Sequence, residues 1–252
     1  MRSVLSEDQW VVGRNPVIEL LVSKQPVDKL LMVSPRSRDL LRIAAIAREK
    51  GVPVKDVSRQ KLDSMFSDTN HQGVAALSAA CNYVEIQDLF DIAARRSQPL
   101  LCVVADNIED PHNLGAVMRS AEAAGAHGII IPKRQGAGVT ASVMKASAGA
   151  AGRLAVVRVP NIAASLNVLK ENGVWIYAAD ISGREWHSVD FSGPAALVLG
   201  NEGRGISKLV MQRSDFIVGI PLHAQTGSLN VSVAGGIILF EISRQRKDAQ
   251  SV

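Results

Sequence analysis

Short apolar runs alternate with segments of helical spacing throughout the second half of the chain. The apolar runs predict strands over 100–105, 128–131, 154–157, 174–179, 196–200 and 216–220. A last helix is expected over 229–246, with Ser228 as its N-cap. Strands that are apolar throughout and alternate with helices indicate a parallel sheet covered on both faces. The predicted fold class of this half is therefore α/β.

The first 80 residues predict a smaller α/β unit. Strands are expected over 29–33, 52–57 and 74–80, and helices over 17–22 and 38–50, the second helix ending at Gly51. Residues 81–98 are more polar and partly helical. We therefore expect an N-terminal domain over 1–80, a linker over 81–98 and a second domain over 99–252.

Composition separates the same two halves. Of 20 glycines, 17 fall in the last 154 residues, which suggests tight loops or close packing there. The net charge is +4, and no acidic residue lies between Glu122 and Glu171. Five of the basic residues in that interval would form a phosphate-binding patch if they share a face: Lys133, Arg134, Lys145, Arg153 and Arg158. Aromatic residues make up only 4%, which argues against a partner held mainly by stacking.

Several function classes lack their signatures. Cys81 and Cys102 lie in or beside apolar runs without metal-ligand spacing, so we expect two reduced thiols and no metal. The first ten residues carry Glu7 and Asp8 and no apolar core, and no apolar run is long enough to cross a membrane. A cytoplasmic protein without a membrane partner is expected. Residues 136–141 match a dinucleotide-binding pattern, but the acidic residue that should follow is missing.

The chemistry is expected in three polar clusters that follow predicted strands, because α/β sheets bind ligands beyond the carboxyl ends of their strands. The first runs from Asp110 to Gly115 and continues to Arg119. Asp110 and Pro111 are typical of a helix start. Asn113 and Arg119 are harder to explain by structure alone, and Gly115 is small enough for another backbone to approach.

The second cluster, from Gly200 to Gly205, places three glycines within six residues directly after an apolar run. One glycine suffices for most turns, so this loop predicts left-handed backbone positions or a close ligand approach. Glu202 is either a solvated turn residue or a carboxylate aimed into a pocket. The third cluster joins Ile220 and Pro221 to residues 227–236, where Ser228 and Asn230 precede Gly235 and Gly236. Glycines inside a helix cost about 1 kcal/mol each relative to alanine, which predicts a close contact there.

Together the three clusters resemble, in order, the motifs of the SpoU-type (TrmH-like) branch of the SPOUT RNA 2′-O-ribose methyltransferases. The resemblance covers residues 99–246. The first 80 residues resemble the L30e-like substrate-binding domain of the 23S rRNA guanosine 2′-O-methyltransferases in this family, with residues 71–74 resembling its closing segment. The resemblance implies a deep trefoil knot in the second domain, a homodimer, an RNA substrate and S-adenosylmethionine (AdoMet) as cofactor.

Carried over residue by residue, the resemblance implies two groups of site residues. Gly200, Asn201, Ile220 and Leu229 would hold AdoMet, largely through backbone groups. The residues that would line the reaction centre are Asn113, Arg119, Glu202, Ser228 and Asn230. The guanidinium group of arginine stays protonated, so Arg119 would stabilise the developing alkoxide or clamp a phosphate rather than act as a base.

Three readings stay open at this point. The leading one is methyl transfer to a guanosine of 23S rRNA. A second keeps the chemistry but acts on tRNA, or on an rRNA site that gives antibiotic resistance. A third is a non-catalytic RNA-binding or ribosome-assembly factor with a relic pocket.

Overall fold

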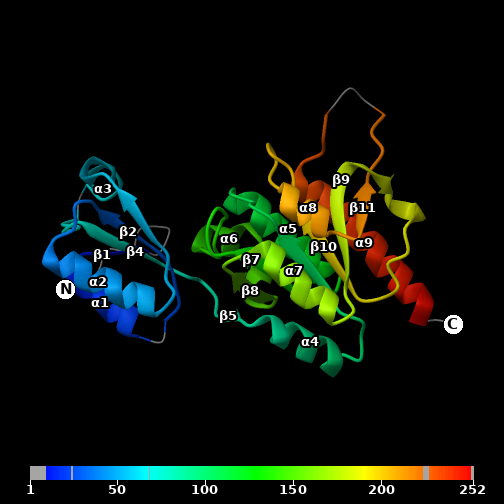
Figure 1. Cartoon of the computed structure of the whole chain (residues 1–252), viewed down its shortest axis with the longest axis horizontal. Coiled ribbons are helices and arrows are strands. Elements are labelled where there is room, and N and C mark those ends of the chain that lie inside the picture. Colours follow the sequence, from blue (N-terminus) through cyan, green and yellow to red (C-terminus); the bar gives the residue numbers. More distant parts are fainter. Residues whose placement is uncertain (1–9, 24, 68, 224–226, 251–252) are drawn as a thin grey trace. The chain divides into compact units, whose positions relative to one another are not determined.

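The computed structural model describes residues 10–23, 25–67, 69–223 and 227–250. The expectation for the first ten residues concerns a segment that lies almost wholly outside these ranges. The chain divides into two compact units, which are described separately here (Figure 1). One comprises Met1–Asn82 with Gly138–Ser142, and the other Tyr83–Ala137 with Val143–Val252.

The first unit is a four-stranded sheet with helices on both faces. Its sheet order is β1-β4-β2-β3, in which β4 runs antiparallel to its two neighbours and β3 runs parallel to β2. The strands are β1 (Trp10–Val12), β2 (Val27–Val33), β3 (Val54–Val57) and β4 (Val74–Ser78). The helices are α1 (Arg14–Val22), α2 (Arg38–Glu49) and α3 (Arg59–Met65).

Alternation along β2 explains the two-sided core of this unit. Leu30 and Met32 point to the face covered by α1 and α2, and Leu31 points to the face covered by α3. The predicted end of α2 at Gly51 is confirmed, since Gly51 adopts a left-handed φ of 65° just after the C-cap. Two elements were missed by the periodicity, β1 and α3, because a three-residue edge strand and a mostly exposed seven-residue helix carry too few apolar positions.

The second unit is a seven-stranded sheet in which every pairing is parallel, in the order β11-β9-β10-β6-β7-β8-β5. Its strands are β5 (Tyr83–Val84), β6 (Leu101–Ala105), β7 (Gly128–Pro132), β8 (Ala155–Val159), β9 (Trp175–Glu185), β10 (Ala195–Leu199) and β11 (Phe216–Gly219). The α/β class with a parallel sheet is therefore confirmed. The trefoil knot stays a prediction.

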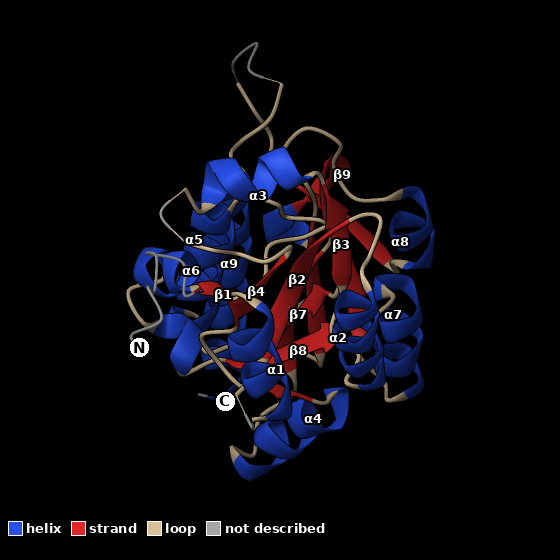
Figure 2. Cartoon of the chain, turned by 90° about the vertical axis from the view of Figure 1, so that its left-hand side faces the viewer, coloured by secondary structure: helices blue, strands red, loops and turns tan. Residues whose placement is uncertain are grey.

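Helices cover both faces of this sheet, with α5 and α9 on one side and α7 and α8 on the other (Figure 2). The helices of this unit are α4 (Ile86–Arg95), α5 (Pro111–Ala123), α7 (Ile162–Glu171), α8 (Lys208–Arg213) and α9 (Val231–Gln250). A further helix, α6 (Ala141–Ala146), has its first two residues in the first unit and the rest in the second. Short 3-10 turns occur at Ala150–Gly152 and Trp186–Ser188. Residues 81–98 contain β5 and α4, and both pack within this second unit.

Strand β9 departs from its predicted bounds. It was expected to end at residue 179 and runs on to Glu185. Ala178 pairs with Ile217, yet Val218 pairs with Arg184, so residues 179–183 bulge away from β11. A side chain at Gly183 would lie 2.5 Å from the Ile217 carbonyl carbon, so the glycine permits this close return to β11. The bulge forms one wall of the site described next.

Candidate active site

A cavity of about 170 Å³ lies at the carboxyl ends of β9, β10 and β11. The β9 bulge, the loop after β10, the segment after β11 and the start of α9 all contribute to its walls. The four residues predicted to hold a cofactor all line it: Gly200, Asn201, Ile220 and Leu229. Glu202 and Ser228 line it too. The position agrees with the general rule for ligand sites in parallel sheets.

The loop after β10 is held closed by contacts between its own backbone atoms. Asn201 and Gly205 exchange two backbone hydrogen bonds of 3.1 and 2.8 Å. A side chain at Gly200 would lie 2.4 Å from the carbonyl carbon of Gly205, and Gly205 itself has a φ of 68°. The glycines therefore serve the loop's closure, and they leave peptide groups exposed toward the cavity.

The Asn201 side chain fixes this loop. Its oxygen accepts hydrogen bonds from the backbone N–H groups of Gly203 (2.9 Å) and Arg204 (3.1 Å), and its amide donates to the carbonyl of Asn107 (3.0 Å). Buried Asp106 adds a second link, because its carboxylate accepts the backbone N–H of Ser207 at 2.7 Å. The loops after β6 and β10 are thus locked together. The sequence singled out neither role, since both partners are backbone groups about 100 residues away.

A chain of side-chain hydrogen bonds crosses the three polar clusters. The amide of Asn113 donates to Glu202 Oε1 at 2.5 Å, and the Asn113 oxygen accepts from the amide of Asn230 at 2.9 Å. The Asn230 oxygen in turn accepts from the hydroxyl and the backbone N–H of Ser232. The structure therefore brings Asn113, Glu202 and Asn230 together, and Glu202 connects this chain to the cavity.

The predicted N-cap of the last helix is wrong. Helix α9 begins at Val231, and Asn230 caps it through its side-chain oxygen and its backbone carbonyl, which accepts from Val233 and Ala234. An asparagine carbonyl reaches the N–H two residues on, so it displaces Ser228 from that task. Ser228 is left lining the cavity.

Arg119 is not brought to this cluster within the chain. It lies on α5 six residues after Asn113, which places it about 120° around the helix and about 9 Å along its axis. Its side chain is exposed and does not line the cavity. Within the described residues it makes no hydrogen bond or ion pair.

The close contacts predicted for Gly115 and Gly235 are confirmed, whereas a side chain at Gly236 would meet its neighbour at ordinary van der Waals distance. A side chain at Gly115 would lie 3.0 Å from the backbone nitrogen of Ser147, so α5 packs directly on the backbone after α6. A side chain at Gly235 would lie 2.7 Å from Leu199, and one at Gly236 would lie 3.5 Å from Ser120. Gly235 therefore lets α9 pack closely against β10.

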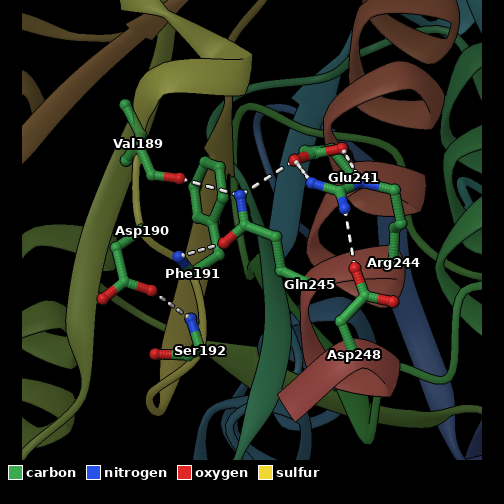
Figure 3. Close-up of polar contacts among 8 residues, drawn as sticks. All are labelled: Val189, Asp190, Phe191, Ser192, Glu241, Arg244, Gln245 and Asp248. Carbon is green, nitrogen blue, oxygen red and sulfur yellow. Dashed lines mark hydrogen bonds and ion pairs between the residues drawn. The ribbon is translucent and has the colours of Figure 1, made fainter. Parts of the chain in front are cut away.

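The C-terminal half of α9 is anchored by polar contacts (Figure 3). Gln245 donates to the carbonyl of Val189 and accepts from the backbone N–H of Phe191. Arg244 pairs with the buried carboxylate of Glu241. The hydrogen bonds from Arg244 hold the pKa of Glu241 below its usual range. Arg246 donates to the carbonyls of Pro99, Leu100 and Gly193, and burial lowers its pKa to about 10. The helix that carries Asn230 at its start is therefore fixed at its other end.

The basic stretch does not act as a single free patch. Arg153 binds the Glu122 carboxylate through two nitrogens, at 2.6 and 3.1 Å. Arg158 lies over the Tyr83 ring and donates to the carbonyl of Lys133. At least two of the five cations are therefore engaged in structural contacts.

No group of three potential metal ligands occurs among the described residues. Burial raises the pKa of the Cys102 thiol to about 12, so this thiol stays protonated and unreactive. None of the described helices is both long and apolar enough to cross a bilayer.

Comparison with known proteins agrees with this geometry. Residues 100–240 match the SpoU rRNA Methylase family, and residues 10–84 match the family described as RNA 2′-O ribose methyltransferase substrate binding. The 23S rRNA (guanosine-2′-O-)-methyltransferase RlmB of Xylella fastidiosa (strain Temecula1) is 41% identical over 244 residues, which cover 95% of this chain and 98% of RlmB. YacO of Bacillus subtilis (strain 168), named as a TrmH family protein, is 40% identical over 95% of this chain and 97% of its own.

Solved structures share the fold. The SpoU methyltransferase AviRb from Streptomyces viridochromogenes, in complex with AdoMet, has a TM-score of 0.61 at 24% identity, covering 96% of this chain and 92% of AviRb. The TrmH/SpoU tRNA modifying enzyme of A. aeolicus has a TM-score of 0.55 at 30% identity, covering 61% of this chain and 78% of its own. The resemblance seen in the three polar clusters is confirmed, and the chain belongs to the SpoU rRNA methylase family.

Proposed function

We propose that the protein transfers the methyl group of AdoMet to the ribose 2′-hydroxyl of a guanosine in 23S rRNA, in the cytoplasm. The observation that carries this proposal is the Glu202–Asn113–Asn230 chain at the edge of the cavity, built from the three clusters the family shares. The similarity to RlmB extends over both units and favours 23S rRNA. The A. aeolicus tRNA enzyme, by contrast, covers only 61% of this chain.

The residues around the cavity fit AdoMet. Apolar side chains of Leu199, Val218 and Ile238 offer an environment for an adenine ring. Gly200 has no side chain to cover its peptide groups, so they are available to a ligand. Ile220 and Leu229 line the same cavity and can offer their own peptide groups. The carboxylates of Asp180 and Glu202 line the cavity and suit a positively charged ligand. We therefore assign cofactor binding to Gly200, Asn201, Ile220 and Leu229, with Asn201 acting by holding the loop.

AdoMet supplies a methyl group bonded to a positively charged sulfur, which is a good leaving group when an oxygen displaces it. The residues of this chain must then hold the attacking 2′-oxygen in line and accommodate the charge that develops as its proton leaves. Glu202 keeps the Asn113 amide oriented, and Asn113 does the same for Asn230. Ser228, free of the helix cap and lining the cavity, is placed to orient the ribose.

Arg119 completes the site in this proposal from a second copy of the chain. A guanidinium stabilises an alkoxide or binds a phosphate with two parallel hydrogen bonds, but Arg119 lies on another side of α5 from Asn113. Helix α9 exposes two large apolar side chains seven residues apart, Val233 at 50% and Phe240 at 54%. Positions i and i+7 share one helical face, and α5 packs on α9, so this apolar face is suited to a homodimer.

A charge on that face tests the homodimer. We expect Phe240→Asp to shift the protein from dimer to monomer in analytical ultracentrifugation. Leu209→Asp, on α8, introduces the same charge at a side chain of similar exposure, 50%, and should leave the dimer intact. A Phe240→Asp protein that sediments like the wild type would exclude this face as the interface.

Mapping of 2′-O-methyl groups in total RNA, from cells with and without the protein, tests the proposed substrate. One guanosine of 23S rRNA should lose its methyl group when the protein is absent. Loss of a methyl group in tRNA, or at a different rRNA nucleotide, would instead assign the substrate to that RNA. A protein that binds no AdoMet in a calorimetric titration would favour a non-catalytic RNA-binding factor.

A further inference from the structure

A pocket of about 330 Å³ lies in the second unit, at the opposite end of its sheet from the candidate active site. Its lining includes Leu101, the first residue of β6, and Gly125, which lies shortly before β7. The candidate active site is at the carboxyl ends of the parallel strands. Strand β6 alone, with five residues, separates the two ends by about 16 Å. A ligand in this pocket would therefore leave the cofactor cavity free.

The pocket carries an excess of positive charge. Three cations line it, and no carboxylate is among the described residues of its lining: Arg96, Arg246 and Lys247. Arg96 is the C-cap of α4, whereas the other two cations lie on α9. The C-terminal ends of α4 and α5 meet the pocket through their C-cap residues, Arg96 and Ala124, and contribute about half a negative charge each. These partial charges offset only about one of the three cations.

Arg246 is the fixed cation of the pocket, and no carboxylate pairs with it in the part of the chain that the structure describes. Its guanidinium donates only to backbone carbonyls, those of Pro99, Leu100, Phe191 and Gly193. These bonds use four of the five N–H groups of an arginine, so one N–H on Nη1 is left. Burial lowers the pKa of Arg246, as expected for a cation removed from water without a full counter-charge. An anion would supply that counter-charge.

Arg96 and Gln98 add hydrogen-bond donors that are available to a ligand. The Arg96 side chain is exposed and makes no hydrogen bond or ion pair with another described residue. The Gln98 amide is oriented by His127, which is neutral at pH 7 because burial lowers its pKa to about 4. Nδ1 of this ring accepts the backbone N–H of Leu101, so Nε2 carries the proton and donates to Gln98 Oε1 at 3.2 Å. The N–H groups of the Gln98 amide are thus left for the pocket.

We propose that this pocket binds a small organic phosphate, a ligand separate from the substrate and cofactor of methyl transfer. Arg96 can hold the phosphate through two parallel hydrogen bonds, and Arg246 and Gln98 supply further donors. A doubly charged phosphate monoester matches the excess of positive charge better than a singly charged carboxylate does. The volume of about 330 Å³ is typical of a site for a small organic molecule. The organic part would lie against the apolar side chains of the lining: Pro99, Leu101, Ala123 and Ala124.

Calorimetric titration of the full chain with phenyl phosphate tests the pocket. We expect the wild type to bind it and Arg96→Ala to bind about tenfold more weakly, the effect of losing a charge-assisted hydrogen bond. Gln98→Glu keeps an oxygen for His127 but places a negative charge among the cations, so it should abolish binding. Arg95→Ala removes an equal charge from the exposed neighbouring position, outside the lining, and should bind like the wild type. Wild-type affinity in Arg96→Ala, or no binding by the wild type, would overturn the proposal.

Three further titrations identify the source of the phosphate and the place where it binds. Inorganic phosphate should bind more weakly than phenyl phosphate, because it has no organic part; equal affinities would overturn the organic ligand. An RNA tetranucleotide without terminal phosphates should show no binding that depends on Arg96, since its phosphodiesters carry one charge each. Binding of this RNA through Arg96, with none of phenyl phosphate, would assign the pocket to an RNA backbone instead. Added AdoMet should leave the affinity for phenyl phosphate unchanged, and competition between the two would place the phosphate in the cofactor cavity and overturn the proposal.

Discussion

The side-chain oxygen of Asn113 accepts a 2.9 Å hydrogen bond from the amide of Asn230, although the two residues lie 117 positions apart. The amide of Asn113 donates at the same time to Glu202. A single asparagine side chain thus connects the start of α5, the loop after β10 and the start of α9. Donor and acceptor must lie on one side chain for this, which an aspartate does not provide when ionised.

Asn113→Asp should therefore disable the site without unfolding it. The new carboxylate has no hydrogen to donate to Glu202 and places two like charges together. We expect kcat/KM for methyl transfer to fall about 100-fold, the usual effect of losing one positioned donor, with AdoMet affinity little changed. His112→Ala, at the exposed neighbouring position, serves as the control. Wild-type turnover in Asn113→Asp would show that this hydrogen-bond chain is dispensable.

Arg119→Ala should abolish methyl transfer while AdoMet binding persists, because the residue lies away from the cavity. If Arg119 acts across a homodimer, mixing Arg119→Ala with Asn113→Asp protein restores activity. Half of the randomly mixed dimers then hold one intact site of two, so recovery should approach about a quarter of the wild-type rate. A mixture as inactive as its components would show that each chain uses its own Arg119.

Gly200→Ala should weaken AdoMet binding. The added methyl group would lie 2.4 Å from backbone atoms of Gly205 and Ile206, so the loop that lines the cavity has to shift. We expect a loss of about tenfold or more in affinity, or roughly 1.4 kcal/mol, by isothermal titration calorimetry. Gly203→Ala is the matched control in the same loop, because its nearest neighbour, Asn201 Oδ1, is 3.6 Å away. Equal AdoMet affinities in Gly200→Ala and Gly203→Ala would contradict the predicted effect of the close backbone contact at Gly200.

Stability should fall with acid through His127. This buried ring accepts the backbone N–H of Leu101 at 2.9 Å, and burial, with Arg96 nearby, lowers its pKa from 6.5 to about 4. The unfolded chain therefore binds a proton between pH 6.5 and 4 that the folded chain does not. The free energy of unfolding should decrease as the pH falls through this range, by up to about 3 kcal/mol. In urea unfolding, the free energy of unfolding of His127→Gln should depend less steeply on pH than that of the wild type. The same pH dependence in both proteins would assign the loss of stability to other groups.

Much of the second unit could be predicted from sequence because its strands are buried on both faces and therefore apolar throughout. The glycine contacts of Gly115 and Gly235 could also be inferred, since each breaks a helical pattern at a cost. The β9 bulge and the Asp106 contact could not, because both depend on backbone groups of distant segments. Asn230 displaced Ser228 at the helix cap for a similar reason, as two polar residues competed for one task.

The position of Arg119 marks the limit of that reasoning. It belongs to the same sequence cluster as Asn113, but six residues along a helix rotate it by about 120°. Sequence spacing alone does not say which surface of the assembled protein a helical residue serves. The charges of the basic stretch show the same limit, because Arg153 has a local carboxylate partner, Glu122.

The most direct test of the account is transfer of a labelled methyl group from AdoMet to a 23S rRNA transcript and to the same RNA carrying a 2′-deoxy sugar at the mapped guanosine. We predict labelling of the first RNA and none of the second, because the accepting oxygen is the 2′-hydroxyl. Equal labelling of both would show that the methyl group goes to a different atom, and it would contradict the function proposed for this site.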